Sequence, residues 1–292
     1  MVLDGFSVLE CPRWHDGRIW VADFYSYRVV SANADGSDMR VEAEVPNQPS
    51  GLGWLPDGRL LVVSMRDSKL LVQDAAGALS VHADLAPFVG GHPNDMVVDS
   101  SGRAYIGNFG FDLMAGAPVA GASLVRVDPD GTASAVADDM LFPNGSVITP
   151  DGVLIVAETF GSRLAAFDIG GDGSLSNRRV WAAFGEPPTS TDLGEALGQL
   201  GVAPDGIGLD AEGAIWVADA LGGRVIRVRE GGEIVDEVKV DVGGVYACML
   251  GGDAGTTLYI CNAPDFDEHA RSAAREARLL AVTVDVPHAG LP

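Results

Sequence analysis

The stretch PDGIGLDAEGAIWVADALGGRVIRVREGG (204–232) contains one unit of the pattern that decides the fold of this chain. An apolar run leads to a turn at Gly213, the phrase AIWVADA (214–220) follows, and RVIRVREGG (224–232) begins a third run. Runs of β-branched and aromatic residues between Gly and Asp turns are typical of short strands rather than helices. The stretch therefore predicts consecutive strands joined by tight turns.

The same unit occurs six times along the chain. Each copy has a five-residue phrase before its turn glycine: ECPRW (10–14), SGLGW (50–54), NDMVV (94–98), NGSVI (144–148), DGIGL (205–209) and YACML (246–250). Successive turn glycines are 41, 44, 50, 61 and 42 residues apart. A strand-rich repeat of about 40–50 residues has the size of a four-stranded propeller blade. We therefore expect an all-β fold, a six-bladed β-propeller with four-stranded antiparallel blades, as a single domain over residues 1–292.

The ends and the long spacings of the repeat carry further expectations. Little sequence precedes the first unit, so residues 6–9 are expected to supply the outer strand of the last blade and to close the ring. The two long spacings place insertions near 110–122 (GFDLMAGAPVAGA) and 185–203. Both fall on connections expected to flank the centre of the ring. Each insertion is either a lid or wall of a central site or a plain surface loop.

Composition limits the partners and the compartment. The formal net charge of −22 disfavours nucleic acids and anionic membranes, both of which need basic patches. No stretch approaches eighteen apolar residues, and the N-terminus has no basic segment followed by a long apolar one. The three cysteines are scattered, without a C-x-x-C motif, and are expected to be reduced and buried. These features predict a cytoplasmic protein that acts on a small molecule.

The first position of the repeated phrase changes character from unit to unit. It reads Glu10, Ser50, Asn94, Asn144, Asp205 and Tyr246. This position starts the strand expected to line the central channel, so the ring would bring Glu10, Asn94, Asn144 and Asp205 together. Carboxylate and amide oxygens favour a hard divalent cation, Ca²⁺ first and then Mg²⁺ or Mn²⁺, with Zn²⁺ or Fe²⁺ as further options. The alternative is that the Asn-Asp, Asn-Gly and Asp-Gly pairs are ordinary turn formers.

Several segments carry a family resemblance. ECPRW, PNDMVVDSSG, FPNGSVITPDG, PDGIGLDAEGAIWVADA and ACMLGGDAGTTLYICNA resemble the signature segments of the regucalcin (senescence marker protein)/gluconolactonase family of six-bladed propellers. The resemblance runs from Glu10 to about Val284 in the expected order. It implies a central metal site with one divalent cation and hydrolysis of lactones, mostly of sugar acids.

The resemblance also implies roles for single residues. Glu10, Asn144 and Asp205 match the metal ligands of the family. Asn94 matches an Asn that lies beside the metal and contacts substrate, or that is a fourth ligand in related propeller phosphotriesterases. Asp95 matches the Asp that follows it. Asp205 and Asp95 are the two candidates for the general base.

The resemblance fails at His92. Sugar lactonases of the family commonly have Arg two residues before the Asn, where it binds substrate hydroxyls. Arg offers five donors in a fixed fork, whereas His offers one or two and titrates near neutrality. Together with the apolar insertion at 110–122, His92 indicates that a more hydrophobic lactone or ester is also a possible substrate. His92 itself is either a proton shuttle or a hydrogen-bonded wall residue.

Two further residues are candidates for the lining of the site. Phe109 and Glu158 end strands that face the expected centre, and each is either a pocket residue or a structural one. The rival functions are a propeller phosphotriesterase that uses the same oxygen-rich centre and a non-catalytic propeller that binds calcium or a small molecule. A metal-free propeller resembling strictosidine synthase fits least, because it needs no Glu10, Asn144 and Asp205 in register.

Overall fold

The six predicted turn glycines shape the chain. In the computed structural model all six have positive φ angles between 72° and 86°: Gly17, Gly58, Gly102, Gly152, Gly213 and Gly255. This left-handed conformation favours glycine, and each of these turns joins the first two strands of a blade. The structure describes residues 1–289, so the last three positions of the predicted 1–292 domain lie outside the described residues.

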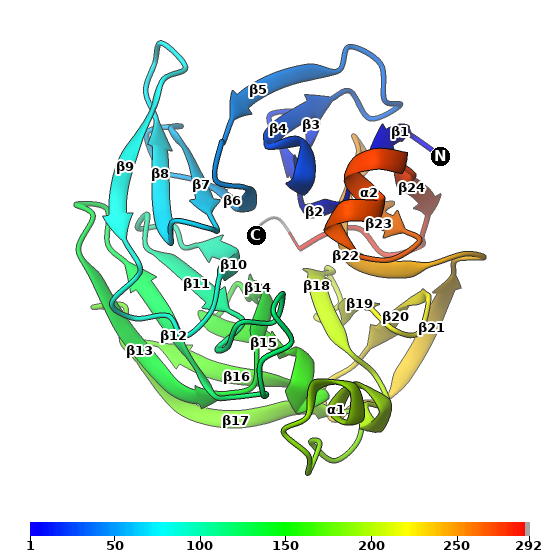
Figure 1. Ribbon diagram of the computed structural model, residues 1–292. Helices are drawn as coiled ribbons and strands as arrows, with labels where there is room; N and C mark the ends of the chain where they lie inside the picture. The colour runs from blue at the N-terminus through cyan, green and yellow to red at the C-terminus, as the bar shows by residue number, and fades with distance from the viewer. Residues whose placement is uncertain (290–292) are drawn as a thin grey trace.

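Six four-stranded antiparallel sheets surround a common axis, as the sequence predicted (Figure 1). Blade 1 contains β2 (Leu9–His15), β3 (Arg18–Asp23), β4 (Arg28–Ala32) and β5 (Arg40–Glu44). Blade 2 contains β6 (Pro49–Trp54), β7 (Leu60–Ser64), β8 (Lys69–Gln73) and β9 (Leu79–Asp84). Blade 3 contains β10 (Pro93–Val98), β11 (Ala104–Asn108), β12 (Ala122–Val127) and β13 (Ala133–Met140).

The second half of the chain continues the ring. Blade 4 contains β14 (Pro143–Ile148), β15 (Val153–Glu158), β16 (Arg163–Ile169) and β17 (Leu175–Ala183). Blade 5 contains β18 (Pro204–Leu209), β19 (Ile215–Asp219), β20 (Arg224–Val228) and β21 (Ile234–Lys239). Blade 6 contains β22 (Gly244–Gly251), β23 (Thr257–Ala263), β24 (Ala277–Thr283) and β1 (Leu3–Phe6).

Short helices lie in the connections between strands. The 3-10 helices η1 (Phe24–Ser26) and η2 (Thr159–Gly161) follow the second strands of blades 1 and 4. The α-helix α1 (Leu193–Gln199) lies in the second insertion, and α2 (Glu268–Ala274) precedes β24. None of the helices described within residues 1–289 is long and apolar enough to cross a membrane. Cys11, Cys248 and Cys261 are buried and unpaired, which confirms the expectation of reduced thiols.

The N-terminal strand closes the ring. β1 pairs with β24, with Leu3 opposite Leu279 and Phe6 opposite Ala277. The outer strand thus ends at Phe6, slightly before the predicted segment 6–9. The shift has a local cause: Ser7 donates through its backbone N and its Oγ to Asp23, at 3.0 and 2.5 Å, and this turns the chain into β2.

Small residues let neighbouring inner strands approach closely. A Cβ atom on Gly145 would lie 2.5 Å from the backbone oxygen of Asp205. A Cβ on Gly206 would lie 2.4 Å from the Cβ of Ala247. Both distances are too short for carbon side chains. The Gly that follows Asn144 and Asp205 in the repeat is therefore required by the packing between blades.

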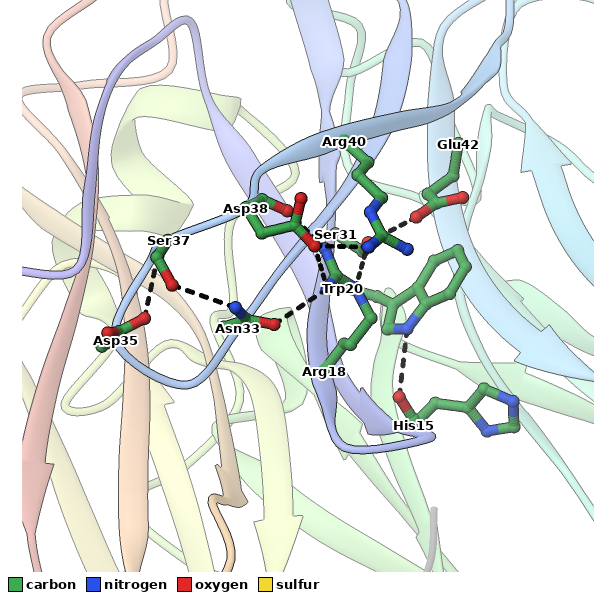
Figure 2. Close-up of polar contacts among 10 residues, drawn as sticks. All are labelled: His15, Arg18, Trp20, Ser31, Asn33, Asp35, Ser37, Asp38, Arg40 and Glu42. Atoms are coloured by element: carbon green, nitrogen blue, oxygen red, sulfur yellow. Dashed lines mark hydrogen bonds and ion pairs between the residues drawn. The ribbon is translucent and has the colours of Figure 1, made fainter.

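The outer strands of blade 1 are tied together by polar contacts (Figure 2). Arg18 Nε on β3 donates to Ser31 Oγ on β4 at 2.8 Å, and Ser31 Oγ donates to Glu42 Oε1 on β5 at 2.5 Å. Trp20 Nε1 donates to the His15 carbonyl at 3.2 Å across the first hairpin. These contacts hold the blade that carries Glu10.

Closure by β1 gives the first prediction. Phe6 is 1% exposed, and the guanidinium of Arg28 lies 5.4 Å from its ring centroid. We expect Phe6→Ala to lower the free energy of unfolding by about 3–5 kcal/mol in urea denaturation, because it leaves a cavity at the closure. Val41→Ala, on an outer strand where the side chain is 51% exposed, is the control and should change it by less than about 0.5 kcal/mol. Equal effects of the two substitutions would contradict this account of closure.

Candidate active site

One cavity of about 390 Å³ opens at the centre of the ring. Five of the six first positions of the repeat line it: Glu10, Asn94, Asn144, Asp205 and Tyr246. Each of the five belongs to the innermost strand of its blade, as expected. The sixth, Ser50, is fully buried and touches this group from below the cavity surface. The fold thus brings the four predicted oxygen-bearing side chains to one place.

A chain of hydrogen bonds runs from blade to blade through these positions. Ser50 Oγ donates to Asn94 Oδ1 at 2.7 Å, and Asn94 Nδ2 donates to Asn144 Oδ1 at 3.0 Å. Asn144 Nδ2 in turn donates to Thr159 Oγ1 at 3.2 Å, and the Thr159 hydroxyl donates to the carbonyl of Pro204, the residue before Asp205, at 2.8 Å. We call Ser50, Asn94, Asn144 and Asp205 the polar belt. Because each amide is held from both sides, its oxygen and nitrogen have defined directions.

The two carboxylates of the site are buried close to each other. Burial, followed by the charges of Asp205 and Asp95, raises the pKa of Glu10 well above its usual value. Burial, followed by the charge of Asp95, raises the pKa of Asp205 in the same direction. Asp205 Oδ1 is buried and has no hydrogen-bond partner among the described residues. Two buried carboxylates with an unpartnered oxygen are a costly arrangement that a bound cation would relieve.

This donor set fits a hard divalent cation. Glu10, Asn144 and Asp205 offer carboxylate and amide oxygens without sulfur or imidazole, the ligand chemistry that Ca²⁺ and Mg²⁺ prefer. Within residues 1–289, no group of three or more His, Cys, Asp or Glu is placed to hold a metal. The set of Glu10, Asn144 and Asp205 differs from such a group because one of its three side chains is an amide.

Asp95 lies beneath the cavity rather than on its wall. Its Oδ1 accepts from Arg13 at 2.6 Å and from the backbone N of Met96 at 2.7 Å. Arg13 is 4% exposed and also donates to the carbonyls of Pro12 and Met96. The ion pair links the inner strands of blades 1 and 3. Asp95 is therefore held by Arg13 and is not among the residues that line the cavity.

Glu158 is a structural residue, and the expectation that it lines the pocket is wrong. Its carboxylate is completely buried, accepts from Arg163 at 2.9 Å and Arg178 at 3.3 Å, and is absent from the cavity wall. It also accepts from the backbone N of Leu141 at 2.9 Å, three residues before Asn144. Glu158 therefore holds the segment that leads into the site.

Two other blades contain the same device, which we call the carboxylate clamp. A buried acid at the end of the second strand binds an Arg five residues later and a backbone N–H just before the site residue. The three clamps are Asp23 with Arg28 and Ser7, Glu158 with Arg163 and Leu141, and Asp219 with Arg224 and Ala203. They occur in blades 1, 4 and 5, which carry Glu10, Asn144 and Asp205. The clamps thus fix the approach of the three expected ligands.

His92 and Phe109 both line the cavity, as expected. Their rings make an edge contact with centroids 6.1 Å apart. Burial lowers the pKa of His92 from its usual value, and the charge of Asp112 opposes this shift. The side chain is therefore predominantly neutral at pH 7, with one N–H donor and one acceptor.

A second ring of cavity residues escaped the sequence analysis apart from Phe109. It consists of the residue that directly follows the second strand of each blade: Phe24, Met65, Phe109, Thr159, Ala220 and Pro264. These six residues share their position in the repeat but not their residue type, so only the position could have identified them in the sequence. Counting one residue beyond phrases such as RLLVVS and RAYIGN would have found most of them.

Both insertions contribute to the wall of the cavity. Leu113 and Met114 from the first and Leu197 of α1 from the second line it. The two insertions also touch, since the backbone N of Val119 donates to the carbonyl of Thr191 at 2.8 Å. Of the two alternatives for these segments, the structure therefore supports the wall elements.

The fold and this cavity define a six-bladed propeller with an oxygen-rich centre. The family described as SMP-30/Gluconolactonase/LRE-like region matches residues 8–264, and the chain belongs to this family. The chain is 29% identical over 260 residues to a 6-deoxy-6-sulfogluconolactonase of Pseudomonas putida, which covers 87% of this chain and 83% of that protein. It is 27% identical over 260 residues to a pentonolactonase of Haloferax volcanii, with coverages of 87% and 81%.

Solved structures show the same fold. A calcium-binding protein, regucalcin, of Agrobacterium tumefaciens matches with a TM-score of 0.78 at 22% identity and covers 100% of this chain and 95% of its own. A gluconolactonase of Xanthomonas campestris matches with a TM-score of 0.69 at 23% identity, with coverages of 90% and 86%. At these identities the likeness concerns the fold alone.

The raised pKa values give a prediction for the metal-free protein. Protonated Glu10 and Asp205 stabilise the fold below the ordinary carboxyl pKa of about 4, and this stability is lost as the pH rises through the raised values. In protein treated with a chelator, Glu10→Gln should therefore raise the free energy of unfolding at pH 8 by about 1–3 kcal/mol. At about pH 4 the substitution should have little effect. Urea denaturation at both pH values measures the difference.

The exposed Glu44 provides the control for this prediction. Glu44→Gln should change the unfolding free energy by less than about 0.5 kcal/mol at either pH. If Glu10→Gln destabilises the metal-free protein equally at pH 4 and pH 8, the two buried carboxylates do not oppose each other as described.

Proposed function

We propose that this protein is a divalent-metal-dependent hydrolase that opens a lactone ring. The observation that carries the proposal is the unpartnered Oδ1 of Asp205 beside the buried Glu10 at the floor of an open cavity. Relatives that span most of this chain are named as lactonases, which supports lactone hydrolysis within this family. A small-molecule lactone is the expected partner.

Glu10, Asn144 and Asp205 would hold the cation, with Ca²⁺ as the first choice. Once bound, a divalent cation would polarise the lactone carbonyl and stabilise negative charge on its oxygen. Asn94 is assigned to orienting Asn144 and contacting substrate, because its Oδ1 already accepts from Ser50 and its Nδ2 already donates to Asn144. This assignment leaves three protein ligands.

Asp205 is the proposed general base. Asp205 lines the cavity, and with Oδ1 on the cation its other carboxylate oxygen would take the proton from water, whereas Asp95 is paired with Arg13 and does not line the cavity. Water then adds its oxygen to the carbonyl carbon, the ring C–O bond breaks, and the proton passes to the departing ring oxygen. His92 is close enough to the cavity to donate one hydrogen bond to substrate, which is its proposed role.

Chelation tests the dependence on metal. Removal of the metal with EDTA should abolish lactone hydrolysis and lower the melting temperature, and excess Ca²⁺ should restore both. A ligand at 100 times its Kd stabilises the fold by about 2.7 kcal/mol. Full lactonase activity in protein shown by elemental analysis to be metal-free would refute the proposal. A melting temperature that falls on chelation, in a protein without activity on any lactone, would instead favour a non-catalytic calcium-binding propeller.

Substitution of the two acids separates their roles. Asp205→Asn should lower kcat/KM by about 10²–10⁴-fold and weaken metal retention. Asp95→Asn should keep kcat within about tenfold but lower the free energy of unfolding by about 3–5 kcal/mol, because it leaves Arg13 buried without its charge partner. Asp57→Asn, in an exposed turn, is the matched control. A greater loss of kcat in Asp95→Asn than in Asp205→Asn would reverse the assignment of the base.

The phosphotriesterase alternative stays a prediction. Paraoxon in the same assay tests it, and turnover of paraoxon above that of every lactone would replace the proposed function.

A further inference from the structure

The cavity has two chemically different parts. Its floor is the polar belt with Glu10, whereas its walls are mainly apolar. On one side Phe109, Phe142 and Phe160 form a run of rings, with centroids 4.7 Å apart for the first pair and 6.1 Å for the second. We call these three residues the aromatic wall. It comes from blades 3 and 4 and stands next to Asn94 and Asn144.

Three of the polar side chains above the floor already have protein partners. Gln48 Oε1 accepts from Arg66 Nε at 2.8 Å, and the Tyr25 hydroxyl donates to the Phe266 carbonyl at 2.8 Å. The Thr159 hydroxyl donates to the Pro204 carbonyl at 2.8 Å. A substrate with several hydroxyl groups would have to give up water here for few new hydrogen bonds, which is costly.

The cavity also offers no cationic side chain. Within residues 1–289, neither Lys nor Arg lines it, while Glu10, Asp205 and Asp265 do. The proposed cation would neutralise Glu10 and Asp205 at the floor, but an anionic substituent away from the floor would lie near Asp265 and meet no cationic side chain. The name of the Pseudomonas putida relative refers to a sulfonated lactone, and the anionic group of such a lactone would find no cationic side chain among the described residues of this cavity.

Exposed apolar side chains gather at the mouth of the cavity. Met114 (44% exposed), Leu221 (51%) and Phe266 (44%) all line it and belong to three different connections. We call them the apolar rim. Large apolar side chains grouped in solvent around a pocket are typical of a binding surface. Part of the rim is anchored, since Tyr25 binds the Phe266 carbonyl and Arg66 binds Glu268 of α2 at 2.6 Å.

We propose, resting on the lactone hydrolysis proposed above, that the substrate is an uncharged lactone with an apolar substituent on its ring. The lactone carbonyl lies at the polar floor, and the substituent packs against the aromatic wall and extends to the apolar rim. Each methylene that the cavity removes from water raises kcat/KM roughly fourfold when the gain is realised in the transition state. The apolar rim sets the preference for the substituent, while the floor acts on the ring common to all lactones.

Three δ-lactones test this inference on the calcium-loaded protein. δ-Decalactone carries a pentyl group, δ-valerolactone carries no substituent, and glucono-δ-lactone carries hydroxyls. We expect kcat/KM for δ-decalactone to exceed that of both others by at least about tenfold, after subtraction of spontaneous hydrolysis. A kcat/KM for glucono-δ-lactone equal to or above that for δ-decalactone would overturn the inference. It would leave the lactonase proposal unaffected. Failure of all three lactones would count against the proposed function itself.

Rim variants locate the preference. Phe266→Ser and Leu221→Ser should each lower kcat/KM for δ-decalactone about fivefold to tenfold and change that for δ-valerolactone by less than twofold. Val81→Ser is the matched control, because Val81 is 60% exposed on β9 and lies outside the cavity. Equal losses on both lactones, or no loss on either, would contradict a role of the rim in recognising the substituent. Melting temperatures close to wild type exclude loss of fold as the cause.

Discussion

Electrostatic repulsion between the buried carboxylates of Glu10 and Asp205 is the interaction on which the rest of this structure depends. Glu10 and Asp205 lie far apart in the sequence, yet the ring places them so that the charge of Asp205 raises the pKa of Glu10. Such a pair destabilises a protein that has nothing to neutralise it. The rest of the ring has to hold both groups in place against this repulsion.

The carboxylate clamps supply that restraint. Each clamp joins the end of the second strand to the segment that leads into the site residue of the same blade. The blades thus position the site residues through charge-assisted hydrogen bonds. The fully buried members of the clamps, Asp23 and Glu158, are shielded from water and therefore from screening by salt. Near the ends of the second strands of blades 3 and 6, the neutral residues Asn108 and Asn262 instead donate through their amide groups to backbone carbonyls. The distribution of charge in the framework thus follows the distribution of site residues in the ring.

Much of the fold was readable from the sequence because position in a repeat is a geometric signal. The turn glycines required left-handed backbone, so their alignment predicted six equivalent strands and brought Glu10, Asn144 and Asp205 into register. Side-chain pairing was not readable in the same way. Glu158 was a candidate because it ends a strand that faces the centre, and Asp95 because it matches the family's Asp after Asn94. Each is bound to an Arg whose direction only the packing determines. Phe142, Phe160 and Phe266 escaped because they lie in connections outside the regular strands, where no periodicity applies.

The most direct test of the account is a crystal structure of the protein grown with millimolar Ca²⁺. The account predicts one ion at the floor of the cavity, within about 2.3–2.6 Å of oxygens of Glu10, Asn144 and Asp205. Asp205 Oδ1 should be among the ligands, and the hydrogen bond from Asn94 to Asn144 should persist. A floor without an ion, in which Asp205 Oδ1 instead shares a proton with Glu10, would contradict it.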